Sequence, residues 1–102
     1  LLLWWAPLMP PEDREPAVRE VDPFARAALL VDGYGLSTDD RSRLVPLSIN
    51  GAERSWFLMR DRARRLGGGW QRMWDAGVGD RIRRRHAWLE SNAAQLHHAV
   101  CG

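Results

Sequence analysis

Apolar residues spaced for one face of a helix predict a first short helix over residues 22–35. Asp22 is suited to the N-cap and Pro23 to the first helical position. Gly33 and Gly35 can adopt the left-handed conformation that ends many helices. The apolar residues recur at the spacing of one helix face: Phe24, Ala27, Ala28 and Val31.

A second apolar stripe is much longer and predicts a long helix that ends at the glycines 67–69. Its members are spaced alternately by four and three residues: Val45, Ile49, Ala52, Trp56, Met59, Ala63 and Leu66. Ser37 and Thr38 are the candidate caps, and acids at 39 and 40 suit the first turn after Thr38. Pro46 predicts a kink or a break near the start.

The last third of the chain predicts one or two helical turns over 70–76 and a final helix over 81–99, capped by Asp80. The stripe of this helix again alternates four and three: Ile82, His86, Leu89, Ala93, Leu96 and Val100. Two long stripes joined by a short Gly-rich segment predict an antiparallel pair of helices, with Trp56 and Leu89 in the core between them. The fold class is therefore all-α, with three to four helices.

The first 21 residues follow a different pattern. The run LLLWWAPLM indicates the end of a buried helix or strand whose beginning is cut off, and the prolines at 7, 10, 11 and 16 predict an extended surface connector to about Val21. Nine residues broken by Pro7 are too few for a membrane span, which needs roughly 20, and no basic signal-peptide region precedes them. We divide the chain into this segment with its connector, 1–21, and a helical subdomain, 22–102.

Composition narrows the possible partners. Six tryptophans favour sites that are mostly buried with one polar contact, and the packing or interface candidates are Trp4, Trp5, Trp56, Trp88 and Leu89. All fifteen basic residues are arginine, but thirteen acids leave a net charge of +2, which argues against nucleic-acid binding. The single cysteine excludes an intrachain disulfide and favours the cytoplasm.

Motifs that carry chemistry are few. The arginines of 60–65 and 81–86 are typical of solvated helix faces with stems over the core, and an acidic partner or nucleic acid is the alternative. His97, His98 and Cys101 do not make a metal site, because adjacent helical histidines diverge and a fourth ligand is missing. His86 is expected as a hydrogen-bonded core histidine. The glycines at 33–35 and 67–69 lack the rest of a nucleotide-binding motif. No catalytic, cofactor-binding or metal-ligating residue is assigned.

Four segments nevertheless resemble a known family: LLLWWAPLMPPEDR at 1–14, DPFARAALLVDGYGL at 22–36, AERSWFLMRDRA at 52–63 and GWQRMWDAGVGDRIRRRHAWLESNAAQL at 69–96. Through them the chain resembles the C-terminal part of the aminoglycoside phosphotransferase-like family, which includes proteins labelled trifolitoxin immunity proteins. The resemblance implies the helical C-terminal subdomain of a kinase-like fold. ATP and Mg²⁺ are then expected only for an intact parent, because the family's His-x-Asp motif is absent here.

Two functional hypotheses follow. In the first, the chain is the C-terminal helical part of a phosphotransferase that phosphorylates a small-molecule hydroxyl from ATP, and its partner is the missing N-terminal catalytic core. In the second, it is a stand-alone helical module that binds a protein partner through its Trp-rich surface. An in-frame His-x-Asp motif in the DNA upstream of Leu1 would distinguish the first from the second.

Overall fold

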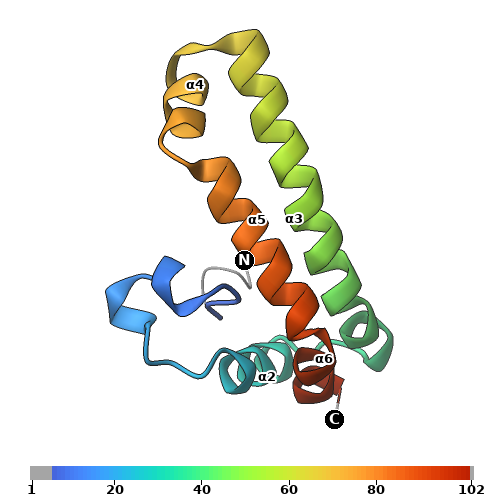
Figure 1. Ribbon diagram of the computed structural model, residues 1–102. Coiled ribbons are helices and arrows are strands. Elements are labelled where there is room, and N and C mark those ends of the chain that lie inside the picture. Colours follow the sequence, from blue (N-terminus) through green and yellow to red (C-terminus); the bar gives the residue numbers. More distant parts are fainter. Residues whose placement is uncertain (1–5, 102) are drawn as a thin grey trace.

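The computed structural model describes residues 6–101, and every regular element in that range is helical (Figure 1). Two 3₁₀ helices, η1 (Pro11–Asp13) and η2 (Pro16–Val18), precede five α-helices. The α-helices are α2 (Pro23–Gly33), α3 (Thr38–Leu66), α4 (Gly68–Asp75), α5 (Val78–Ser91) and α6 (Ala93–Cys101). The predicted all-α class is confirmed. Trp4 and Trp5 lie outside the described residues.

The antiparallel pair of long helices is α3 and α5, which lie side by side in Figure 1. Helix α4 joins them at one end, and α2 and α6 close the other end. Leu89 of α5 is fully buried, as predicted. Trp56 of α3 is only half-buried, so the prediction that it belongs to the core was wrong. It lies toward the α4 end, where the ring of Trp74 and the guanidinium of Arg83 cover it.

Helix α2 begins and ends as its sequence predicts. The carboxylate of Asp22 accepts hydrogen bonds from the backbone N–H groups of Phe24 (3.0 Å) and Ala25 (3.3 Å). Gly35 has a φ of 65°, and the two crossed backbone hydrogen bonds of a Schellman motif end the helix. These run from the Gly35 N–H to the Asp32 carbonyl and from the Leu36 N–H to the Val31 carbonyl, both at 3.1 Å.

Helix α3 is continuous through Pro46, so of the two predicted alternatives, a kink or a break, the break does not occur. Its N-cap is Ser37, whose hydroxyl accepts from the Asp40 N–H at 3.1 Å. A proline inside a helix costs about 3 kcal/mol because it removes one hydrogen bond and crowds the preceding turn. Val45 and Ala52 are both buried in the core, and this packing on either side of Pro46 offsets the cost.

The predicted final helix is two helices, and Asn92 separates α5 from α6. Its side-chain amide donates to the Trp88 carbonyl at 2.8 Å, and that carbonyl also accepts from the Asn92 backbone N–H at 3.0 Å. Asp80 is not the cap of α5. The helix starts after Gly77, whose φ of 99° makes the turn out of α4, and Asp80 lies in the first turn.

The N-terminal connector is more ordered than an extended surface loop. Residues 6–9 form no regular helix or strand, but Ala6 and Leu8 are fully buried. The prolines at 11 and 16 begin the two 3₁₀ helices, because their fixed φ suits a first helical position. The side chain of Arg14 is buried between these turns and α5.

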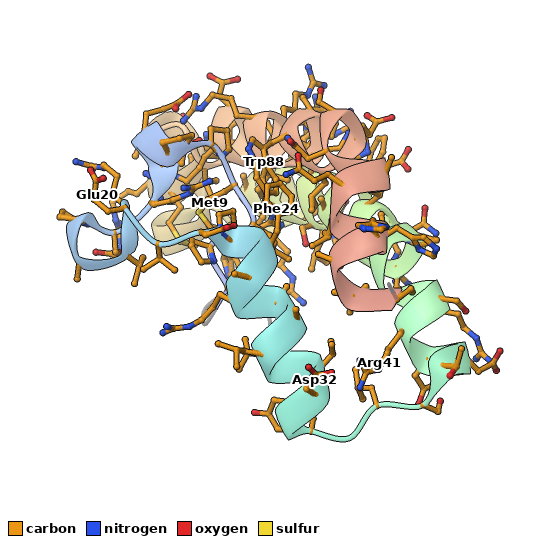
Figure 2. All side chains as sticks on the ribbon, turned by 90° about the horizontal axis from the view of Figure 1, so that it is seen from below. Met9, Glu20, Phe24, Asp32, Arg41 and Trp88 are labelled. Carbon is orange, nitrogen blue, oxygen red and sulfur yellow. The ribbon has the colours of Figure 1, made fainter. Side chains whose placement is uncertain are left out.

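The buried core occupies the end formed by α2, α6 and the adjoining halves of α3 and α5. It consists of Ala6, Leu8, Ala27, Val31, Val45, Ala52, Leu89, Leu96 and Val100. Phe24 and Trp88 stack beside it, with ring centres 5.7 Å apart, and Figure 2 shows both near Met9 of the connector. Within residues 6–101, no helix is long and apolar enough to cross a membrane.

Candidate functional site

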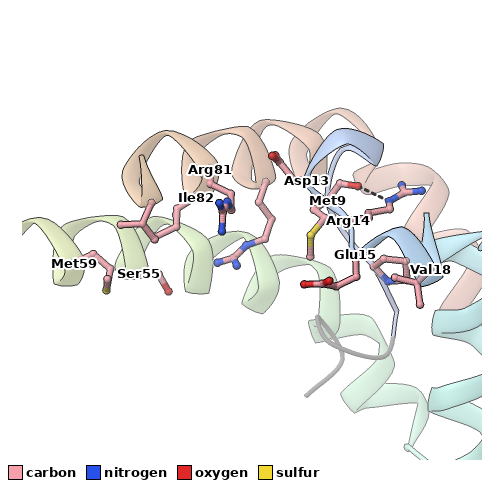
Figure 3. A pocket seen from close by; sticks show the side chains of 12 residues that line it. Met9, Asp13, Arg14, Glu15, Val18, Ser55, Met59, Arg81 and Ile82 are labelled. Atoms are coloured by element: carbon pink, nitrogen blue, oxygen red, sulfur yellow. Dashed lines mark hydrogen bonds between the residues drawn. The ribbon is translucent and has the colours of Figure 1, made fainter. Parts of the chain in front are cut away.

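A cavity of about 430 Å³ opens between the connector, α3 and α5 (Figure 3). This size is within the range of small-molecule sites, roughly 300–1,000 Å³. Its walls are mostly apolar, and the residues that line it are Pro7, Met9, Asp13, Arg14, Glu15, Val18, Ser55, Met59, Val78, Arg81, Ile82 and Arg85.

Arg85 is the unusual residue of this cavity. Its Nε is buried and has no hydrogen-bond partner, and no acidic side chain of residues 6–101 forms an ion pair with it. Burial lowers the pKa of Arg85, because a charged guanidinium loses hydration there. Arg81, four residues earlier, also lines the cavity and also lacks an ion-pair partner within the described range. Arg81 and Arg85 are therefore guanidinium groups of the cavity with neither a carboxylate nor a carbonyl of residues 6–101 bound to them.

Two other charged groups of the cavity, Asp13 and Arg14, are already engaged. Asp13 is 8% exposed and accepts two hydrogen bonds from Arg84, at 2.9 Å to its Oδ2 and 2.8 Å to its Oδ1. These bonds lower the pKa of Asp13 and raise that of Arg84. Arg14 donates to the Met9 carbonyl at 2.9 Å, the bond drawn in Figure 3, and burial lowers its pKa.

The Asp13–Arg84 pair was not predicted from the sequence. The pattern of 81–86 indicated a solvated face for Arg84, and the residue is exposed, but its guanidinium also connects α5 to the connector. The two partners are 71 positions apart, so no helical spacing could show their contact. The sequence offered only an acidic residue in the proline-rich connector, and it predicted that this connector lies on the surface.

A second region with functional potential is a cluster of aromatic rings and arginines, which we call the Trp56 surface: Trp56, Phe57, Arg60, Trp74 and Arg83. The ring of Trp56 meets those of Phe57 and Trp74 edge to face, at 5.0 and 5.6 Å between ring centres. The guanidinium of Arg83 lies 4.0 Å from the centre of the Trp56 ring, and that of Arg60 lies 4.9 Å from it. These are cation–π contacts, which leave the positive charges without a carboxylate.

The Trp56 surface borders a shallow depression of about 210 Å³ between α3 and α5. Its apolar floor includes Ala52 and Ile82, and Phe57 at its edge is 49% exposed. His86 also lines it and is half-buried, with Nδ1 3.3 Å from Glu90 Oε1. The prediction that His86 is a core histidine was therefore wrong, because its ring lies at the edge of the helix pair.

The remaining predicted residues lie away from both regions. Trp88 is half-buried against Phe24, with Arg14 over its ring at 5.8 Å. Cys101 is exposed, and its Sγ lies 3.8 Å from His97 Nδ1. Residues 6–101 contain no group of three or more side chains placed to hold a metal ion.

Comparisons with protein-family models, with curated proteins and with solved structures gave no match to this chain. The cavity and the Trp56 surface are therefore the basis for assigning a function. The cavity presents unpaired guanidinium groups within apolar walls, and the Trp56 surface presents aromatic rings beside unpaired arginines. Both are arrangements that bind ligands or proteins.

Proposed function

We propose that this chain is a helical docking subdomain, which binds another protein through the Trp56 surface. The observation that carries the proposal is the exposure of Phe57 next to Trp56, Arg60 and Arg83 above a hollow with an apolar floor. Aromatic residues and arginine are enriched where proteins bind one another, and anchors of this kind provide most of the binding energy.

Charge specifies the chemistry of the partner. Residues 54–83 carry eight arginines and three acids, whereas the rest of the chain carries seven arginines and ten acids. No acidic side chain of residues 6–101 pairs with Arg60 or Arg83. A partner segment with an apolar anchor flanked by acidic residues complements this surface, because it fills the hollow and neutralises both guanidinium groups.

The resemblance suggests which protein this partner is. We propose the missing N-terminal catalytic core of a phosphotransferase, of which this chain is the C-terminal helical part; the intact enzyme would use ATP and Mg²⁺ in the cytoplasm to phosphorylate a small-molecule hydroxyl. The alternative is a separate protein bound by a stand-alone module. An in-frame His-x-Asp motif in the DNA upstream of the Leu1 codon supports the first, and its absence supports the second.

The docking surface is testable without knowing the partner. The probe is a synthetic 20-residue amphipathic helix with a leucine stripe flanked by glutamates, titrated by calorimetry. Phe57→Ser and Arg83→Ser should each weaken binding about tenfold or more, equivalent to about 1.4 kcal/mol. Leu29→Ser changes a leucine on α2 at the opposite end that is even more exposed than Phe57; it is the matched control and should leave binding unchanged.

Three results would contradict the proposal. The first is equal binding of the same peptide with lysines in place of its glutamates, and the second is equal loss of binding in Leu29→Ser and Phe57→Ser. The third is binding of single-stranded RNA in preference to the acidic peptide, which would assign these rings and arginines to nucleic-acid stacking.

A further inference from the structure

The cavity between the connector, α3 and α5 shares Ile82 with the hollow beside the Trp56 surface, but its polar groups are different. Its apolar walls include Met9, Val18, Met59 and Ile82. Arg85 reaches it from α5 without any hydrogen-bond or ion-pair partner among residues 6–101. A buried, unpaired charge destabilises a fold, because the guanidinium has lost water and gained nothing in exchange. An anion that enters the cavity would supply the missing partner.

Helix geometry brings a second cation to the same place. Arg81 and Arg85 are four residues apart on α5, so their side chains lie on one face, one turn from each other. Both line the cavity, and Figure 3 shows Arg81 beside it. Two guanidinium groups on one helix face can hold the two oxygens of a carboxylate, since each group is a planar fork of donors.

The acids of the cavity do not fill this role. Asp13 already accepts two hydrogen bonds from Arg84 and is therefore neutralised. Glu15 lines the cavity but is exposed and forms no ion pair with any arginine of residues 6–101. An incoming ligand competes with water for Arg81 and Arg85, and not with a formed salt bridge.

We propose that this cavity binds an organic carboxylate with an apolar body, which Arg85 and Arg81 hold by its carboxylate. The apolar part of the ligand contacts Met59 and Ile82, and the hydroxyl of Ser55 is a further polar group in the lining. The carboxylate can come from a free acid, such as a short fatty acid, or from the C-terminus of an apolar peptide. Both sources share the same recognition chemistry.

The experiment titrates the intact chain with octanoate and with octanamide, its neutral analogue. Binding is followed by calorimetry and by the NMR signal of the Arg85 Nε–H, which should shift as the carboxylate binds. Two further probes, acetyl-trileucine with a free and with an amidated C-terminus, distinguish a peptide source from a free acid. We expect saturable binding of at least one of the two acids, and at least tenfold weaker binding of its neutral analogue.

Variants then separate binding from folding. Arg85→Met keeps the length of the side chain and removes the charge. It should weaken binding of the acid at least tenfold while the urea midpoint stays the same or rises, because an uncompensated buried charge is gone. Arg64→Met removes an exposed arginine of α3 outside the cavity and should change neither quantity.

The proposal fails if neither acid binds saturably below about 1 mM, or if the neutral analogues bind as tightly as the acids. It also fails if Arg85→Met binds the acid as tightly as the unmodified chain. A lower urea midpoint in Arg85→Met with unchanged binding would mean that Arg85 has a structural role only.

Discussion

The two ends of the α3–α5 pair are held together by different forces. At the α2–α6 end, apolar side chains fill the space between four helices, and Leu8, Leu89 and Leu96 are fully buried. At the α4 end, the described residues of α4 include none that is buried, and the contacts are rings and guanidinium groups. The α2–α6 end excludes water from its core, whereas the α4 end keeps its charged groups near water.

A single arginine shows how closely the α2–α6 end is connected. Arg41, at the start of α3, donates to the carbonyls of Leu36 (2.9 Å), Val31 (3.3 Å) and Val100 (3.4 Å) and forms an ion pair with Asp32 at 2.7 Å. Figure 2 shows Arg41 and Asp32 facing each other across this end. One side chain thus satisfies the C-terminal carbonyls of two helices.

The arginines of the α4 end have a different role. Arg62 lies over Trp70 at 4.7 Å, and Arg83 lies over Trp56, so each guanidinium covers an aromatic face and keeps donors for another partner. The same residue type therefore stabilises the fold where backbone carbonyls accept its hydrogen bonds, and in the proposed function it contributes binding energy where rings surround it. Under the proposed function, stability and recognition are located at opposite ends of one helix pair.

The largest expected effect tests where the stability is located. Leu89→Ala removes a fully buried side chain from the core and should cost about 2–5 kcal/mol of unfolding free energy. Met73→Ala, on the exposed face of α4, should cost less than about 0.5 kcal/mol. Urea unfolding followed by circular dichroism measures both. Similar costs for the two variants would remove the distinction between the ends.

An intermediate effect is expected where α4 packs on α5. At Gly79 an added Cβ would lie 2.8 Å from two ring atoms of Trp74 and 3.3 Å from Trp56 Nε1. Gly79→Ala should therefore displace the Trp74 ring at a cost of about 1–3 kcal/mol, of which better helix propensity returns about 1 kcal/mol. Tryptophan fluorescence and urea unfolding would detect the change.

Gly51→Ala is the matched control for Gly79→Ala. It lies within α3 with no atom near its Cβ position, so the substitution should stabilise the chain by about 0.5–1 kcal/mol without altering the fluorescence. Equal stabilisation by both alanines would show that Trp74 does not pack against α5 as described.

The sequence predicted elements whose ends are set by local chemistry. Asp22, Pro23 and Gly35 determine the limits of α2 through neighbouring hydrogen bonds, and these limits were predicted to within two residues. The split at Asn92 was missed, because the apolar stripe continues from Leu89 through Leu96 regardless of the backbone between them. The spacing of apolar residues predicts which face of a helix is buried. It does not predict a hydrogen bond from a side chain to the backbone of its own helix.

The candidate site was less predictable because it depends on contacts between distant residues. The RIRRRH run gave four arginines with one expected environment, whereas the structure gives them different contacts: Arg81 lines the cavity, Arg83 covers Trp56 and Arg84 binds Asp13. Arg85 is half-buried, and its buried Nε has no partner among residues 6–101. These differences come from what packs against each side of α5, which one-dimensional spacing does not contain.

The smallest expected effect concerns the pair that joins the connector to α5 between the two ends. The Arg84 hydrogen bonds hold the pKa of Asp13 below its usual 3.8. A carboxyl with a lowered pKa in the folded state adds stability above its unfolded pKa and loses it as the pH falls through the folded value. Asp13→Asn should therefore unfold at lower urea than the unmodified chain near neutral pH, and the difference should shrink below about pH 3.8.

Arg84→Gln should show the same dependence on pH as Asp13→Asn. The double variant should lose no more stability than either single variant, because both substitutions remove the same interaction. A difference that persists unchanged to about pH 2 would assign the effect of Asp13 to packing, and the connector would then be held to α5 without this ion pair.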